Sequence, residues 1–223
     1  MKSDKNEVLT RPINKLRPVL RLNEREYKFS NISIIIFLIG GPLSCLIIYW
    51  FLSLRVNYWL YEINTKQIVF LLNIFFNLNA EVTLTTEQHI FPMIFIPNHP
   101  YTANFSMTTE CIGAHVISIF IGLVIWVPAS RNELTREDFK WRKAKTVIIS
   151  VSVIYISNII RIVLLLYLNF RGIPFEFIHQ SIYFLSAILG ALFFTYLLHK
   201  WLPEIFISLY YVYPLISQNK TRN

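Results

Sequence analysis

The sequence holds a cysteine, an arginine and a histidine whose chemistry is complementary. Cys111 opens the apolar stretch CIGAHVISIF, Arg161 lies inside the apolar run VIYISNIIRIVLLLYL, and His179 opens the stretch HQSIYFL. A thiolate can attack a carbonyl carbon, a histidine can accept and return protons, and a fixed cation can stabilise the oxyanion that forms. The three residue types therefore make up a cysteine nucleophile site if the fold brings them together.

The elements that must position these residues are those of a membrane protein. The chain has 223 residues, of which 54% are hydrophobic, and its mean hydropathy is +0.47. That composition is too apolar for one soluble core. The net charge of +8 comes from basic residues that gather beside apolar runs, so we expect membrane orientation rather than binding of nucleic acid.

Four segments are long enough for a helix to cross a bilayer core about 30 Å thick: 32–54, 111–128, 147–168 and 179–199. The shorter runs 67–78 and 205–216 predict interfacial or packed helices. The predicted fold is an all-α polytopic membrane protein with about four transmembrane helices, short interfacial helices and a small extracytoplasmic segment. Its expected parts are a basic cytoplasmic tail (1–30), a first transmembrane helix (31–54), an extracytoplasmic segment with an amphipathic helix (55–110), a catalytic transmembrane core (111–199) and a C-terminal cytoplasmic segment (200–223).

The positions of Lys and Arg set the expected orientation in the cell membrane. Basic residues crowd before the first span and between the second and third, whereas none lies between Lys66 and Arg131. The positive-inside rule makes the crowded segments cytoplasmic and the intervening loop extracytoplasmic. Cys111 and His179 then lie at the outer ends of their spans, and Arg161 lies about 22 Å across from the start of its helix. The site is therefore expected to face the extracytoplasmic side.

Asn158 shares a helix face with Arg161, because it lies three residues earlier. An ionisable residue inside a span is a functional-site hypothesis by default. A structural reading also stays open, in which this polar face is an interfacial anchor or a hydrogen-bonding centre between helices.

More than one histidine could serve as the base. His115 lies four residues after the cysteine and would reach it on one helix, so spacing alone slightly favours it over His179. His89 and His99, in the expected outer loop, also stay open, and His199 is expected on the cytoplasmic side. The two cysteines show neither CxxC spacing nor a metal-ligand pattern with the histidines, so we expect no metal and no other cofactor.

The ordered motif set resembles the archaeosortase and exosortase family of membrane transpeptidases, with the archaeal branch favoured. The family pattern is Cys-x-Gly at the start of a helix, Asn-x-x-Arg late in the next, and a histidine some twenty residues on. Here these positions are Cys111 with Gly113, Asn158 with Arg161, and His179, and the resemblance covers residues 67–199. Two features depart from the family: Ile112 stands where many members have Thr or Ser, and the chain has fewer spans than larger members.

The resemblance implies a cysteine peptidase and transpeptidase that cleaves C-terminal sorting signals of exported proteins. In it Cys111 is the nucleophile, Arg161 stabilises the oxyanion and His179, rather than His115, is the general acid and base, with Asn158 and Gly113 in support. It implies a thioester intermediate that an amine, by analogy one on a membrane lipid, resolves. Two alternatives stay open: a cysteine protease without transfer, and a non-enzymatic transporter subunit or scaffold.

Overall fold

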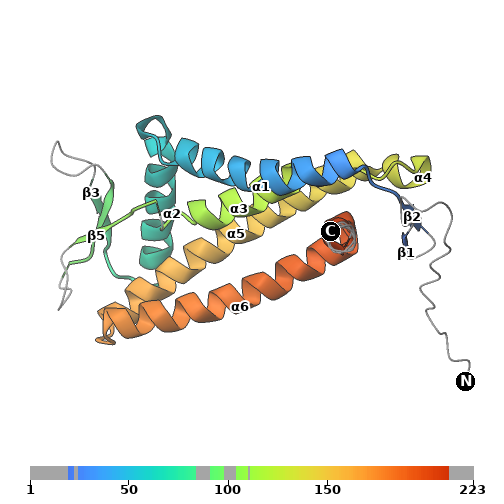
Figure 1. Cartoon of the computed structure of the whole chain (residues 1–223). Helices are drawn as coiled ribbons and strands as arrows, with labels where there is room; N and C mark the ends of the chain where they lie inside the picture. Colours follow the sequence, from blue (N-terminus) through green and yellow to red (C-terminus); the bar gives the residue numbers. More distant parts are fainter. Residues whose placement is uncertain (1–19, 23–24, 84–90, 98–103, 110, 211–223) are drawn as a thin grey trace, which may run out of the picture. The chain divides into compact units, whose positions relative to one another are not determined.

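The computed structural model describes residues 20–22, 25–83, 91–97, 104–109 and 111–210. Helix makes up 74% of the structure, as expected for the predicted all-α class (Figure 1). The elements in chain order are β1 (Leu20–Leu22), β2 (Arg25–Tyr27), α1 (Asn31–Leu52), the 3-10 helix η1 (Arg55–Asn57), α2 (Tyr58–Phe76), β3 (Glu81–Thr83), β4 (Met93–Phe95), β5 (Asn104–Ser106), α3 (Ala114–Ile125), α4 (Glu133–Arg136), α5 (Phe139–Phe170) and α6 (Phe175–Trp201). Residues 204–210 are also helical.

Among the described residues, three helices are long and apolar enough to cross a membrane, namely α1, α5 and α6. The fourth predicted span, 111–128, is not confirmed, because its helix α3 has only 12 residues and covers about 18 Å. Local backbone chemistry explains the short helix. Gly113 has a φ of +72°, outside helical geometry, and Pro128 disfavours helical conformation in the residue before it.

Other helix bounds also differ from the predictions. α2 is longer than the expected 67–78, and its extra turns carry Glu62 and Lys66, which form an ion pair at 2.6 Å. α5 and α6 begin at Phe139 and Phe175, several residues before the predicted starts. Part of the expected helix 205–216 and both loop histidines lie outside the described residues.

The chain divides into two compact units. The first contains residues Met1–Ser44, Ile121–Ile148 and Thr195–Asn223, and the second contains Cys45–Phe120 and Ile149–Phe194. All three residues of the expected catalytic set lie in the second unit, so this unit carries the candidate site.

The first unit contains a buried ion pair centred on Arg142. The two terminal nitrogens of its guanidinium bind both carboxylate oxygens of Glu204, at 2.7 and 3.2 Å. They also donate to the carbonyls of Trp201 and Thr135, and Nε donates to Asp138. All three guanidinium nitrogens are therefore bonded, and α4, α5 and the segment after α6 are tied together.

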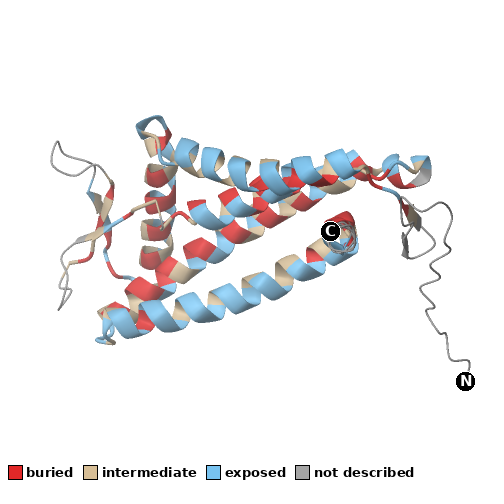
Figure 2. Cartoon of the chain, viewed as in Figure 1, coloured by how far each residue is buried: buried red, intermediate tan, exposed pale blue. Residues whose placement is uncertain are grey.

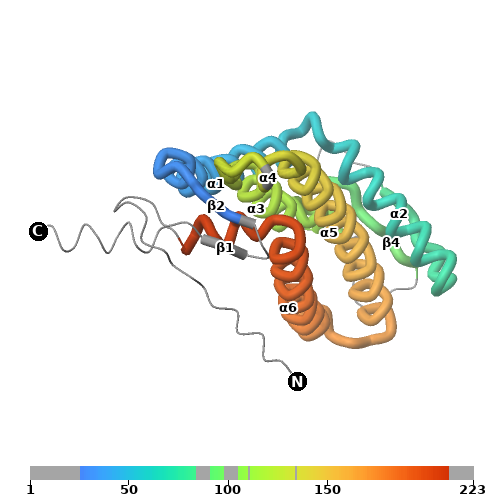
Figure 3. Tube along the Cα trace, turned by 90° about the vertical axis from the view of Figure 1, so that its right-hand side faces the viewer, coloured from blue at the N-terminus to red at the C-terminus, as the bar shows by residue number. Residues whose placement is uncertain are grey.

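The core of the second unit lies where α2, the C-terminal half of α5, the start of α6 and the β3–β4–β5 sheet meet. α2 lies beside that half of α5 in two perpendicular views (Figures 1 and 3), and Figure 2 shows buried residues on both. The buried members of this core are Ile68, Leu72, Leu78, Ala80, Ile94, Ile96, Met107, Ile159, Ile162, Val163, Leu165, Leu166 and Ile178. Cys111 packs against this cluster.

Candidate active site

A small antiparallel sheet leads the chain to Cys111. Its strand order is β3-β4-β5, with Val82 facing Ile94 and Ile94 facing Phe105. The sheet is fixed to the end of α2 by Asn73, whose side-chain amide accepts a hydrogen bond from the Ala80 amide at 2.6 Å and donates one to the Ala80 carbonyl at 2.9 Å. Three-residue strands have little stability alone, so this anchor and the buried Ile94 hold them.

A turn between β5 and α3 presents Cys111. The Cys111 amide donates to the carbonyl of Thr108 at 3.0 Å. Two residues later the chain adopts a left-handed conformation at Gly113, which glycine accepts without the steric cost of a Cβ. Ile112 and Ala114 on either side are buried against Tyr61 of α2. Cys111 therefore lies in a turn before α3, not in the first turn of a membrane-spanning helix.

Asn158 of α5 holds this turn in place. Its side-chain amide donates a hydrogen bond to the carbonyl of Cys111 across 47 positions of the sequence. Asn158 is buried, and its side chain is also the nearest neighbour of Gly113: a Cβ built on that glycine would lie 3.6 Å from the Asn158 side-chain carbon. The Cys-x-Gly and Asn-x-x-Arg motifs thus meet directly in space.

The thiol of Cys111 is half-buried and has two oxygen atoms near it. The Thr108 hydroxyl lies 3.5 Å from Sγ, where either atom can donate. The carbonyl of Ser106, the last residue of β5, lies 4.0 Å from Sγ. A hydroxyl that can donate to sulfur is suited to stabilising a thiolate, whereas a carbonyl can only accept from the neutral thiol.

A buried tyrosine supports the same turn from α2. The Tyr61 hydroxyl is within bonding distance of Thr109 Oγ1, at 3.0 Å, and of the Leu52 carbonyl, at 3.3 Å. Burial raises the pKa of Tyr61 above its ordinary value of 10.0, against the opposing effect of the hydrogen bond with Thr109. Tyr61 is therefore a neutral donor at physiological pH, which keeps the residues before Cys111 tied to α2.

Arg161 lies one helical turn after Asn158 on α5 and is half-buried. Its guanidinium forms no hydrogen bond or ion pair with any residue that the structure describes. Its neighbour Ile162 belongs to the buried cluster against which Cys111 packs. The backbone at Arg161 therefore runs beside this cluster, and no described carboxylate neutralises the cation.

His179 lies in the second turn of α6, four residues after the helix begins, and its side chain is exposed. Its ring stacks between two aromatic rings of the same helix, with centroid distances of 5.6 Å to Phe175 and 6.3 Å to Tyr183. Within the described part of the chain no hydrogen bond joins His179 to Cys111 or Arg161. The structure therefore joins the cysteine and asparagine motifs directly but does not join the histidine to them.

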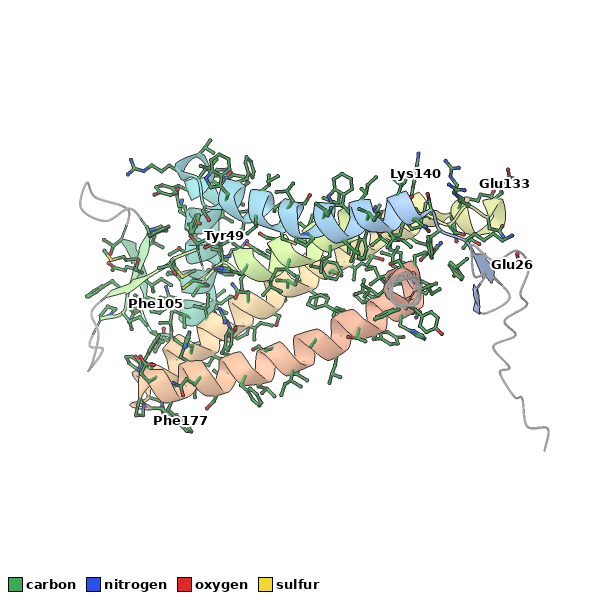
Figure 4. The ribbon with its side chains drawn as sticks, viewed as in Figure 1. Glu26, Tyr49, Phe105, Glu133, Lys140 and Phe177 are labelled. Carbon is green, nitrogen blue, oxygen red and sulfur yellow. The ribbon has the colours of Figure 1, made fainter. Side chains whose placement is uncertain are left out.

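A continuous set of contacts nevertheless connects His179 to the cysteine turn. Phe175 contacts Phe105 of β5 with a ring-centroid distance of 6.0 Å. Figure 4 labels Phe105. Phe105 precedes Ser106, whose carbonyl faces the thiol of Cys111. The start of α6 and the end of β5 are therefore packed side by side in the second unit.

His115 does not have the helical relationship to the cysteine that the spacing predicts. α3 begins at Ala114, so Cys111 lies before the helix and an i, i+4 contact within one helix does not form. The His115 ring instead packs on Tyr49, at a centroid distance of 4.2 Å. This packing removes the argument that favoured His115 over His179.

Sequence reasoning missed three contributors to the site: Ser106, Thr108 and Tyr61. Thr108 had a usable signal, since a threonine three residues before a cysteine can form a turn that closes on it. Ser106 and Tyr61 had none, because their roles come from contacts made across the fold.

Comparisons with protein-family models, curated proteins and solved structures find no match to this chain. The fold itself defines the class: a mostly helical protein whose described residues include three helices that could cross a membrane.

Proposed function

We propose that this protein is a membrane-embedded cysteine transpeptidase that cleaves C-terminal sorting signals of exported proteins at the extracytoplasmic face of the cell membrane. The observation that carries the proposal is the contact between the two motifs: Asn158 binds the carbonyl of Cys111, and Arg161 follows on the same helix without a described partner. A structural arginine in a buried region is normally paired. An arginine that has no partner among the described residues, one helical turn after the residue that holds the cysteine turn, suits a site where negative charge develops during a reaction.

In the proposed reaction, His179 takes the proton of the Cys111 thiol and the thiolate attacks the carbonyl carbon of the scissile peptide bond. Arg161 stabilises the oxyanion. The carbon–nitrogen bond then breaks, His179 returns the proton to the leaving amine, and the acyl group remains on sulfur as a thioester. An amine, in the favoured version one on a membrane lipid, attacks the thioester and regenerates the thiol. His179 must approach the thiol for these proton transfers.

Membrane confinement contributes to this reaction. The hydrophobic helix of a sorting signal would lie in the bilayer, and the residues before it would meet the enzyme at the membrane surface. Holding two reactants together removes much of the entropic cost of bringing them into contact. α6 offers an apolar surface for such a helix, since only 6% of the 18 residues in its most apolar stretch are buried.

The test compares the two cysteines of one protein. Cys45 donates to the carbonyl of Ile119 at 3.5 Å and serves as an internal reference thiol. The purified protein in detergent is treated with iodoacetamide at mildly acidic pH, and labelling of each cysteine is followed by mass spectrometry. We expect Cys111 to react at least about tenfold faster than Cys45, and replacement of Arg161 or His179 by Gln to slow only Cys111.

Equal labelling rates at the two cysteines would overturn the proposal and favour the scaffold or transporter reading. The fate of the cleaved protein separates the two enzyme readings. A co-expressed exported protein that carries a hydrophobic, basic C-terminal signal is recovered with and without the enzyme. A shortened product with added lipid mass supports transfer, and one that ends in a free carboxylate shows a protease. A Cys111→Ser variant should yield neither.

A further inference from the structure

The free edge of strand β5 lies next to the thiol. β5 pairs with β4 on one side, and no described residue pairs with its other side. An unpaired strand edge presents backbone N–H and C=O groups that can bind another extended chain. In recognition by strand addition, a peptide forms main-chain hydrogen bonds with such an edge.

The hydrogen-bond pattern shows which residue of β5 presents its backbone to that edge. Facing residues of an antiparallel ladder alternate between bonded and non-bonded pairs. Met107 donates to the carbonyl of Pro92 at 2.9 Å, so the next bonded pair along the ladder is Phe105 with Ile94. Ser106 lies between them, and its N–H and C=O therefore point away from β4.

The position of the sulfur agrees with this assignment. Cys111 Sγ lies 4.0 Å from the carbonyl oxygen of Ser106, so the thiol is on the free side of β5. Ser106 is exposed, whereas Phe105 is directed into the core and contacts Phe175. Ser106, on the edge where the sulfur lies, is therefore open to solvent.

We propose that the substrate binds as an added strand on the free edge of β5, with its backbone hydrogen-bonded to Ser106. A paired strand would run about 4.7–4.9 Å from β5. A strand at that separation would run past the sulfur, which lies 4.0 Å from the Ser106 carbonyl oxygen. The occupant is the extended segment of an exported protein that precedes its hydrophobic helix, so this inference rests on the proposed function. It adds how the substrate binds: the backbone of Ser106 recognises the main chain of the substrate.

The test uses a peptide that labels the thiol without turnover. An acetylated trialanine chloromethyl ketone alkylates a cysteine by losing chloride, and its rate at Cys111 is divided by the rate for iodoacetamide. A Cys45→Ser background restricts labelling to one thiol. Ser106→Pro removes the free N–H, which proline tolerates on a strand edge, and Ser106→Ala keeps it as the matched control.

We expect Ser106→Pro to lower the ratio of peptide to iodoacetamide labelling by about threefold to tenfold. Ser106→Ala should leave the ratio unchanged. On the unmodified enzyme, N-methylation of each peptide amide in turn should lower the ratio at one position, the amide that donates to Ser106. An unchanged ratio in Ser106→Pro, together with no sensitive position in the methylated series, would overturn the proposal.

This experiment is independent of the test of the proposed function. Slow labelling of Cys111 by iodoacetamide alone would count against catalysis, but the ratio would still report strand addition. Fast iodoacetamide labelling with an unchanged ratio would keep the cysteine chemistry and remove only this binding mode. A fall in both rates without a change in their ratio would also count against strand addition.

Discussion

The side-chain amide of Asn158 donates a hydrogen bond to the backbone carbonyl of Cys111. This single bond links α5 to the turn before α3 and joins two motifs that are 47 residues apart in the sequence. Because the bond goes to the main chain, it fixes the turn without engaging the thiol. Asn158 is thus a positioning residue for Cys111.

Asn158→Leu should destabilise the protein by about 1–3 kcal/mol, because it leaves the Cys111 carbonyl without its donor in a poorly hydrated place. The measurement is the thermal midpoint in detergent. Ser157→Ala, at the exposed position next to it, is the matched control and should leave the midpoint unchanged. Equal midpoints for Asn158→Leu and the control would show that the hydrogen bond does not contribute.

Gly113→Ala should cost about 1–2 kcal/mol of stability, because an alanine is strained at a φ of +72°. Crowding is not the reason, since the nearest heavy atom to the added Cβ would be 3.6 Å away. Gly113→Asn should cost less, because asparagine tolerates left-handed backbone. Both are compared by thermal unfolding with Gly190→Ala, a helical glycine where alanine should be neutral or stabilising. An Asn variant less stable than the Ala variant would contradict this account.

Much of this arrangement could be predicted from the sequence, and the rest depended on contacts across the fold. The apolar runs of α5 and α6 were long enough to identify both helices, although their starts were missed because amphipathic and basic turns extend a helix beyond its apolar part. The span expected at Cys111 is not confirmed, because hydropathy does not report the backbone conformation at Gly113. The β3–β4–β5 sheet left no periodic signal, since three residues are too few for alternation to show.

The buried pair of Arg142 and Glu204 gives a stability prediction for the first unit. Glu204→Gln should destabilise the protein by about 3–5 kcal/mol, because it removes the buried counter-charge of a partly buried guanidinium and leaves only the more exposed Asp138 to pair with it. The double replacement Arg142→Met with Glu204→Leu should recover much of that loss. Glu62→Gln, which breaks an exposed ion pair with Lys66, is the control and should change stability by less than about 1 kcal/mol. A double variant that is no more stable than Glu204→Gln would contradict the pairing.

Arg161 gives the sharpest test of the proposed chemistry, because its guanidinium has no partner among the described residues whose loss could explain an effect. If it holds the oxyanion with two N–H groups, Arg161→Lys should lower the rate of signal cleavage by about 10²–10³-fold, close to the effect of Arg161→Ala. The thermal midpoint of both variants should stay near that of the unmodified protein. The control is Arg171→Lys, at an exposed position just after α5, which should change neither quantity. A Lys variant that retains most of the activity would mean that charge alone is needed at this position. A fall in the midpoint that parallels the loss of activity would mean that Arg161 acts through the fold.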